Sequence, residues 1–321
     1  MQRCIIFLHF TNSKLVTAIN RIMREYFPKK ITESQVPKKK SSSRKNSIFI
    51  NRHIRIPCYQ NECKPSISYH TPCKCVTKFI DSTADKLEDA ENLPQNDYSV
   101  SKSLHDYAKQ SLLIGKVSPT DENIEIIKNA SLYADTINLE DFNLNHLLEI
   151  HRLVMAKNDQ LAGKIRDQDV VIRLPKDKGS SLIKRIQTPL AHELHDCLEK
   201  YFQWFREKMK NSETNDLIFA AMAKYYFFTI HAFDDGNGIT SRIILNAILR
   251  KFSPYWVTIP LAEIAKYYAV IGIAQNSNNY NPYLAYITNC IRRSSDIYID
   301  EDRTRRNQMA AAGYFCCIHG R

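Results

Sequence analysis

The chain has 321 residues, and its 44% hydrophobic and 10% aromatic content excludes a globally disordered, collagen-like or disulfide-scaffold protein. Its formal net charge of +11 comes from 45 Lys and Arg against 34 Asp and Glu. Residues 1–80 hold 16 of the basic and 3 of the acidic residues, so the other 29 basic and 31 acidic residues nearly balance. The basic charge therefore belongs to the N-terminal segment and not to the whole protein.

Residues 1–80 are expected to form a basic and largely disordered segment. The Ser-rich run PKKKSSSRKNS at 37–47 offers little apolar surface to bury. Simple solvation of the charges is the favoured interpretation, with a nuclear address or an anionic partner as the alternative. Nucleic acid binding by residues 1–80 is disfavoured, because the Lys and Arg residues near 37–55 lack the interleaved aromatic rings of a stacking platform, apart from Phe49 and Tyr59.

The nine cysteines and the lack of a long apolar run bear on the compartment. An odd number of dispersed cysteines favours reduced thiols, and no apolar run approaches the roughly 20 residues of a membrane-spanning helix. We expect a cytoplasmic protein without a signal peptide, and a secreted effector is left open. Zinc binding is disfavoured because C-x2-C pairs are missing from the candidate ligands Cys58, Cys63, Cys73 and Cys75, with His53 and His70.

Hydrophobic periodicity predicts an all-α core with one small β element. A run of β-branched residues followed by Pro and Gly predicts a short strand at Asp169–Leu174, one arm of a hairpin. The tail from Ser294 shows no clear period. Helices are expected at about 82–92, 100–113, 120–135, 144–154, 189–210, 216–230, 241–251, 261–275 and 282–293.

The segment HAFDDGNGITSR at 231–242 lies between two apolar helices and carries the chemistry. Gly236, Asn237 and Gly238 can adopt positive φ, so that backbone N–H groups and a helix N-terminus face one anion. Arg242 offers a bidentate fork for phosphate oxygens.

Two further side chains complete this segment. Asp235 is a hard oxygen ligand suited to a Mg²⁺ that bridges phosphates. His231 titrates near neutrality and is the candidate general base. Each group alone is a weak signal, but the combination between two helices is specific.

This segment resembles the motif of the Fic (Fido) family, H-P-F-x-[DE]-G-N-G-R-x-x-R. Three further segments, at 148–172, 203–205 and 266–287, resemble family segments in the same order. The resemblance implies a Fic-type helical core with a β-hairpin flap at residues 99–293, between a candidate inhibitory helix at 81–98 and a C-terminal tail at 294–321. The matching motif residues are His231, Phe233, Asp235, Gly236, Asn237, Gly238 and Arg242.

The resemblance implies transfer of AMP from ATP to a hydroxyl of a target protein, with other donors left open. His231 would take the hydroxyl proton, Asp235 would hold Mg²⁺, and the 236–238 loop with Arg242 would bind phosphates. Val170, Val171 and Ile172 would form the flap that docks the target protein by strand addition. A homo-oligomer is left open. The adenine would contact Tyr267 or Tyr268, with Gln275 or Asn276.

The sequence departs from the family pattern at two motif positions. Ala232 replaces a proline, which removes no chemical group. Ile239 replaces the first motif arginine, and losing a guanidinium that faces phosphate would weaken nucleotide handling on the order of 10- to 150-fold. The alternatives to a weakened transferase are a diverged nucleotide- or protein-binding module and a protein that removes AMP.

Many Fic proteins carry an inhibitory helix, [ST]-x-x-x-E-[GN], whose glutamate pairs with the second motif arginine. The candidate here is residues 84–89, ADKLED, in which Glu88 would face Arg242. A carboxylate there would compete with phosphate for one fork. A solvent-exposed Glu88 is the alternative.

Overall fold

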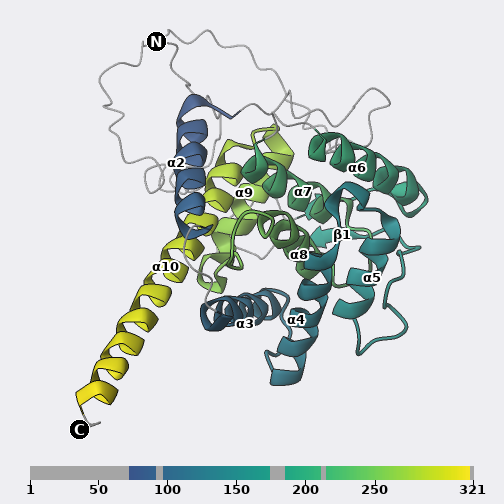
Figure 1. The fold of residues 1–321 in the computed structure, drawn as a ribbon. Helices are drawn as coiled ribbons and strands as arrows, with labels where there is room; N and C mark the ends of the chain where they lie inside the picture. The colour runs from purple at the N-terminus through teal and green to yellow at the C-terminus, as the bar shows by residue number, and fades with distance from the viewer. Residues whose placement is uncertain (1–71, 92–96, 174–184, 211–214, 319–321) are drawn as a thin grey trace, which may run out of the picture.

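The computed structural model describes residues 72–91, 97–173, 185–210 and 215–318, and the all-α fold class is confirmed there (Figure 1). Short 3-10 turns at Leu139–Asp141, Ala191–Glu193 and Leu261–Glu263 precede α5, α6 and α9. The helices are α2 (Lys74–Glu91), α3 (Asp97–Ile114), α4 (Asp121–Thr136), α5 (Leu144–Val154), α6 (Leu194–Met209), α7 (Asp216–Ile230), α8 (Asn237–Leu249), α9 (Ile264–Ser277) and α10 (Asn281–Ile318).

Three helix starts follow from capping side chains that the sequence shows. The side chains of Thr120, Asn143 and Asn215 accept hydrogen bonds from first-turn N–H groups of α4, α5 and α7. Each cap satisfies donors that a helix N-terminus leaves unpaired. For this reason the predicted starts of these three helices agree with the structure to within a residue.

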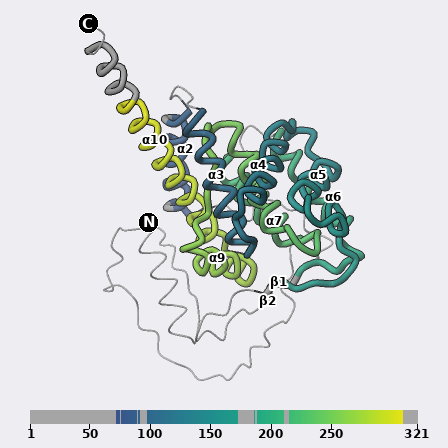
Figure 2. Tube along the Cα trace, turned by 90° about the horizontal axis from the view of Figure 1, so that it is seen from below, coloured from purple at the N-terminus to yellow at the C-terminus, as the bar shows by residue number. Residues whose placement is uncertain are grey.

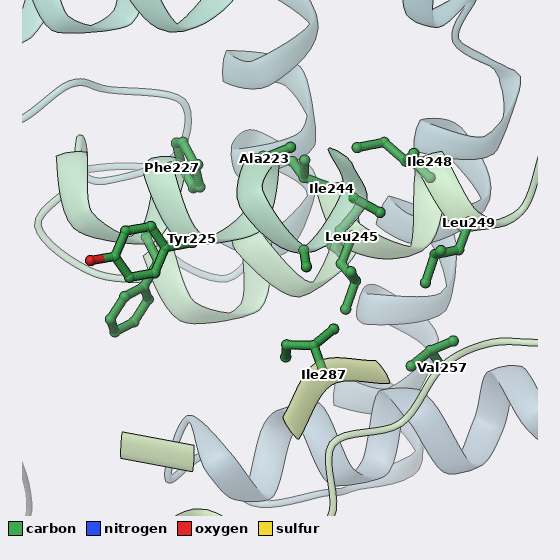
Figure 3. Close-up of a cluster of buried hydrophobic side chains, with 14 of the residues drawn as sticks. Ala223, Tyr225, Phe227, Ile244, Leu245, Ile248, Leu249, Val257 and Ile287 are labelled. Atoms are coloured by element: carbon green, nitrogen blue, oxygen red, sulfur yellow. The ribbon is translucent and has the colours of Figure 1, made fainter. Parts of the chain in front are cut away.

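Helices α7 and α8 form the centre of the core. In α7 13 of 15 residues are buried, and in α8 12 of 13, as expected of helices that are apolar on every side. Figure 3 shows the packing between them, which continues to Val257 and to Ile287 of α10. The loop joining α7 and α8, residues 231–236, is therefore anchored at both ends by the most buried helices of the protein.

The small β element is a two-stranded antiparallel pair. Strands β1 (Val171–Arg173) and β2 (Arg185–Gln187) pair with Ile172 opposite Ile186. Ile172 and Ile186 are both buried, whereas Val171 on the alternate face is 38% exposed. The prediction of a strand that forms one arm of a hairpin agrees with this pairing.

The two ends of the described chain correct the predicted boundaries. Helix α2 begins at Lys74, inside the segment expected to be disordered, and α10 runs on through the expected tail to Ile318. The two helices lie side by side, and the C-terminal part of α10 extends beyond the helical body (Figures 1 and 2). Ser295 and Tyr298 of α10 are buried, so tertiary packing stabilises a helix that shows little apolar period.

Several predictions lie outside the described residues. These are the disorder of residues 1–71 and the candidate zinc ligands His53, Cys58, Cys63 and His70. Among the residues that are described, no helix combines the length and apolar character needed to cross a bilayer.

Candidate functional site

The loop between α7 and α8 is held in an uncommon backbone conformation at both ends. His231 ends α7 with φ 53° and ψ 55°, and Gly236 precedes α8 with φ 75°. A Cβ atom at Gly236 would lie 3.0 Å from Nε2 of His151 and 3.1 Å from the sulfur of Met155. Glycine is therefore required at 236 both for its backbone conformation and for space.

Helix α8 begins at Asn237, four residues before the predicted start at 241. The hydrogen bonds of the helix begin at Thr240, whose N–H donates to the Gly236 carbonyl at 2.9 Å. Among described residues, no acceptor pairs with the N–H groups of Gly238 and Ile239. The N–H groups available to bind an anion are thus those of the first turn of α8. Of the three residues Gly236, Asn237 and Gly238, only Gly236 has a positive φ.

Asn237 secures this loop through its side chain. Its Oδ1 accepts from the Phe233 N–H at 3.0 Å, and its Nδ2 donates to the Phe233 carbonyl at 2.6 Å. Both groups of the buried amide are therefore used within the loop. Asn237 orients the site, and its side chain does not point its donors at a ligand.

His231 presents one ring nitrogen as a base. Its Nδ1 lies 3.3 Å from the Phe228 carbonyl, which can only accept, so Nδ1 carries the proton and Nε2 keeps its lone pair. Burial, with a smaller contribution from the nearby charge of Arg166, lowers the pKa of His231 to about 4. The imidazole is consequently neutral near pH 7 and able to take a proton.

His151 of α5 packs against the loop, and it is a residue of this site that lies outside the motif. Its ring stacks on Phe233 at 3.6 Å between centroids and 5° between planes. Its Nδ1 accepts from the Gly163 N–H at 3.1 Å, so Nε2 donates to the Asp235 carbonyl at 3.0 Å. Burial lowers the pKa of His151 to about 4. The identifying signal was a histidine within an otherwise apolar helix face.

Arg166 links the loop to the strand pair. Its Nε donates to the His231 carbonyl at 2.8 Å, and its backbone N–H donates to the Ala232 carbonyl at 3.0 Å. Its Nη2 donates to the Pro189 carbonyl, two residues after β2, at 2.7 Å. One buried guanidinium therefore fixes the backbone of His231 relative to the end of β2.

A cavity of about 460 Å³ opens in front of this loop, within the usual size of a small-molecule site. One part of its wall is apolar and includes Ile126, Ile127 and Phe228. The loop side and the facing end of α3 supply His231, Asp235, Gly236, Gly238, Ile239, Arg242, Gly115 and Lys116. The predicted site residues that line this cavity are His231, Asp235, Gly236, Gly238, Arg242, Tyr268 and Ile172.

Asp235 is exposed at the cavity, and its Oδ1 accepts the Gly236 N–H at 2.7 Å. The second carboxylate oxygen is open to a ligand. No group of three or more His, Cys, Asp or Glu side chains in the described residues could hold a metal unaided. A single carboxylate still fits Mg²⁺, which commonly takes one or two carboxylates and completes its shell with phosphates and water.

Arg242 is buried in the cavity wall and is held by α3. Its Nε donates to the hydroxyl of Ser111 and its Nη2 to the carbonyl of Ser111, each at 2.8 Å. A Cβ added to Gly238 would lie 3.4 Å from Nη1 of Arg242. Nη1 is therefore the guanidinium nitrogen that lies beside the first turn of α8.

The expected adenine contacts are only partly supported by the structure. Tyr268 lines the cavity, but the fully buried Tyr267 does not, and its hydroxyl bonds to the amine of Lys224. Asn276 is exposed and donates to the Gly272 carbonyl of its own helix at 2.6 Å. Neither Asn276 nor Gln275 lines the cavity, so of the expected adenine contacts only Tyr268 lies at it. Consecutive helical residues face about 100° apart, which separates Tyr267 from Tyr268.

The flap residues lie at the cavity edge. Ile172 lines the cavity, Val171 is exposed on the other face of β1, and the Val170 carbonyl accepts from Thr188 Oγ1 at 2.5 Å. Strand β1 pairs on one side with β2. Its other edge has no strand partner among the described residues.

The inhibitory assignment of Glu88 is wrong. Glu88 is exposed on α2 and does not line the cavity, and Arg242 is bound by Ser111. The pattern [ST]-x-x-x-E-[GN] fits the end of α3 better, because Ser111 supplies its first residue. There, however, Gly115 stands in place of the glutamate and Lys116 in place of Gly or Asn. The end of α3, next to Arg242, therefore lacks the inhibitory carboxylate of the family pattern.

Comparison with known proteins identifies related chains. Residues 141–249 match the model of the Fic/DOC family. Proteins named protein adenylyltransferase Fic are similar. The one from Drosophila melanogaster is 28% identical over 162 residues, which is 50% of this chain and 30% of the relative. The one from Drosophila mojavensis is 28% identical over 159 residues, 49% of this chain and 29% of the relative. The match thus spans less than a third of these relatives.

Two solved structures share the fold. Fic-1 (residues 134–508) from C. elegans aligns with a TM-score of 0.59 at 20% identity, covering 72% of this chain and 73% of that chain. A Fic family protein from Desulfovibrio desulfuricans aligns with a TM-score of 0.61 at 16% identity, covering 73% of this chain and 76% of that chain. These likenesses establish the fold alone.

Proposed function

We propose that this chain, whose residues 141–249 match the Fic/DOC family model, transfers AMP from ATP to a hydroxyl side chain of a target protein. The observation that carries the proposal is the cavity that His231, with its Nε2 free, shares with the first turn of α8 and Arg242. A neutral base beside phosphate-binding donors is the arrangement that nucleotidyl transfer to a hydroxyl requires.

The reaction follows from these positions. Nε2 of His231 takes the proton of the target hydroxyl, and that oxygen attacks the α-phosphorus of ATP. The new O–P bond forms as the bond to the bridging oxygen of the β-phosphate breaks, and pyrophosphate leaves with the electron pair. The N–H groups of α8 and Nη1 of Arg242 stabilise the charge that develops on the phosphate oxygens.

Asp235 would hold a Mg²⁺ through its open carboxylate oxygen. When bound, the ion would neutralise phosphate charge and help to orient the leaving group. His151 supports this role, because its Nε2 donates to the Asp235 carbonyl and its ring supports Phe233. The backbone of Asp235 is thus held by the neutral imidazole of His151.

The target protein would dock on the free edge of β1. An extended peptide added to this edge places its hydroxyl near Ile172, which shares the cavity with His231. Arg166 then has a positioning role, since it joins the His231 backbone to Pro189 after β2.

Ile239 points to a slow enzyme, or to one that binds nucleotide without turning it over. Its apolar side chain lies in the cavity wall, where it offers phosphate no charge. Glu88 lies away from the cavity and does not support removal of AMP through that residue. Binding without transfer is therefore the second candidate, and turnover separates the two.

The test uses the full chain with Mg²⁺ and ATP labelled either at the α- or at the γ-phosphate. We expect label from the α-position alone on the protein itself or on lysate proteins, with the mass of AMP on Ser, Thr or Tyr. His231→Ala should abolish labelling, and His195→Ala, at an exposed histidine of α6, should not. Equal labelling by His231→Ala would reject the base assignment, and ATP binding without labelling would support the binding module.

A further inference from the structure

We infer that Lys116, at the end of α3, binds the distal phosphates of the nucleoside triphosphate and supplies the cationic charge that the cavity lacks at Ile239. Both residues line the cavity, and both lie beside Gly115. This inference rests on the proposed function in one respect, because it takes ATP as the ligand of the cavity.

The charges of the cavity lead to Lys116. Its lining includes three basic residues, Lys116, Lys157 and Arg242, and one acidic residue, Asp235. Two donor nitrogens of Arg242 are used by Ser111, and Lys157 pairs with Glu122 at 2.6 Å. The amine of Lys116 has no hydrogen bond or ion pair with any described residue. Of the three cations that line the cavity in the described part of the chain, Lys116 is therefore the one whose donors are all available to a ligand.

The backbone at Lys116 is also unusual. Its φ of 60° places a lysine in the left-handed conformation that normally favours glycine at a helix end. The N–H groups of Lys116 and Val117 donate to the carbonyls of Leu113 and Leu112, at 3.1 and 3.0 Å, and close α3. Glycine would end the helix with less strain than lysine does, so helix closure does not explain the lysine side chain.

The surroundings of Lys116 favour an electrostatic contact. Ile114, Val117 and Ile239 also line the cavity and offer a phosphate no charge, whereas the side chain of Lys116 is exposed and charged. A charge-assisted hydrogen bond from its amine to a phosphate oxygen is stronger than one between neutral groups. The nearest alternative for the lysine is a favourable interaction with the C-terminal end of the α3 dipole, which would affect stability and not nucleotide choice.

The test is equilibrium binding of ATP and of AMP, each with Mg²⁺, by isothermal titration calorimetry. Lys116→Ala should weaken ATP binding about tenfold or more and change AMP binding less than about twofold, because AMP lacks the distal phosphates. Lys116→Arg should keep the affinity for ATP. Lys109→Ala, at an exposed lysine of the same helix, is the matched control and should change neither.

Lys116→Gly separates ligand binding from helix closure. Glycine adopts the backbone conformation without strain, so this variant should melt at the same or a higher temperature and still lose ATP affinity. In an Ile239→Arg background, Lys116→Ala should cost less ATP affinity, since the new guanidinium supplies the charge. An equal cost in both backgrounds would overturn the inference.

The outcomes also separate this inference from the proposed function. Unchanged ATP affinity in Lys116→Ala, or equal losses of affinity for ATP and AMP, would overturn the inference. Labelling from ATP that carries the label at the α-phosphate would still uphold the transferase. Loss of ATP affinity that depends on Lys116, without any labelling, would uphold the inference and reject the transferase. Absence of ATP binding by the unsubstituted protein would overturn both.

Discussion

The guanidinium of Arg242 on α8 is bound by both oxygens of Ser111 on α3, through hydrogen bonds of 2.8 Å to the hydroxyl and to the carbonyl. Both residues are buried. The arginine to which we assign phosphate binding is thus oriented by the last turn of a helix that lies more than a hundred residues earlier in the chain. The position of α3 therefore determines where Arg242 can point.

Ser111→Ala should disturb Arg242 without removing its charge. The Nε of Arg242 would lose its acceptor in a buried site, so we expect the free energy of unfolding to fall by about 1–3 kcal/mol. Labelling by α-labelled ATP should fall several-fold. The measurements are urea unfolding and initial labelling rates, with Ser277→Ala as the control because that hydroxyl bonds only within α9, at 2.7 Å. Unchanged labelling would mean that Arg242 keeps its place without Ser111.

Gly115→Glu should inhibit the protein. An ideal Cβ at Gly115 lies 3.5 Å from the Ser111 carbonyl, the same oxygen that accepts from Arg242. A glutamate there is close enough to pair with Arg242 and compete with phosphate for its donors. We expect ATP affinity and labelling to fall about tenfold or more, a loss typical of a removed charge-assisted contact.

Two companion variants isolate the charge in that experiment. Gly115→Gln has nearly the same size without the carboxylate, so it should retain most of the activity. Glu88→Gly on α2 should leave labelling unchanged, since Glu88 does not line the cavity. Equal inhibition by Gly115→Gln and Gly115→Glu would attribute the effect to steric blocking of the cavity.

The rate of transfer should stay nearly constant down to pH 5. Burial lowers the pKa of His231 to about 4, so the imidazole remains an unprotonated base across this range. A base with the ordinary pKa of about 6.5 would instead lose about 30-fold between pH 8 and pH 5. Labelling rates at saturating ATP and Mg²⁺, measured from pH 8 to pH 5, distinguish the two. A fall centred near pH 6.5 would place His231 in a more solvated environment.

Stability should decrease as the pH falls from 7 to 5. Burial lowers the pKa of His151 to about 4, so the unfolded chain takes up a proton near pH 6.5 that the folded protein cannot accept. This histidine alone should account for about 2 kcal/mol of lost unfolding free energy over that interval, and His231 acts in the same direction.

His151→Phe checks this assignment. The phenyl ring can keep the stack on Phe233, while the titrating group and its two hydrogen bonds are removed. The variant is expected to be less stable at pH 7, so the quantity to compare is the difference in unfolding free energy between pH 7 and pH 5. An unchanged difference would show that other groups cause the pH dependence.

Some helix boundaries can be predicted from the sequence, and others cannot. The capping side chains Thr120, Asn143 and Asn215 act on adjacent N–H groups, so their effect can be predicted from neighbouring residues alone. The extent of α10 could not be predicted in this way. Its contacts with α2 and α3, such as the pairing of Lys86 with Asp296 at 2.5 Å, join residues far apart in the chain.

Lys224 illustrates the same limit within α7. A lysine is ordinarily expected at the surface, yet this one is fully buried, with its amine 4.6 Å from the centre of the Tyr267 ring. Burial lowers the pKa of Lys224 well below its usual range. The apolar residues around Lys224 predict its burial, but its partner Tyr267 lies on α9, far along the chain, and could not be predicted from neighbouring residues.

The sequence by itself determined which residues can perform the chemistry. The order of His231, Asp235, Gly236 and Arg242 between two apolar helices is local information, and the chemical groups are inherent in the residue types. The tertiary structure decided which of them share a cavity and what faces them. Gly115 and Lys116, directly after α3, line the cavity, and Ser111 of α3 binds Arg242, because α3 packs against α4 and α8, and such contacts depend on the whole core.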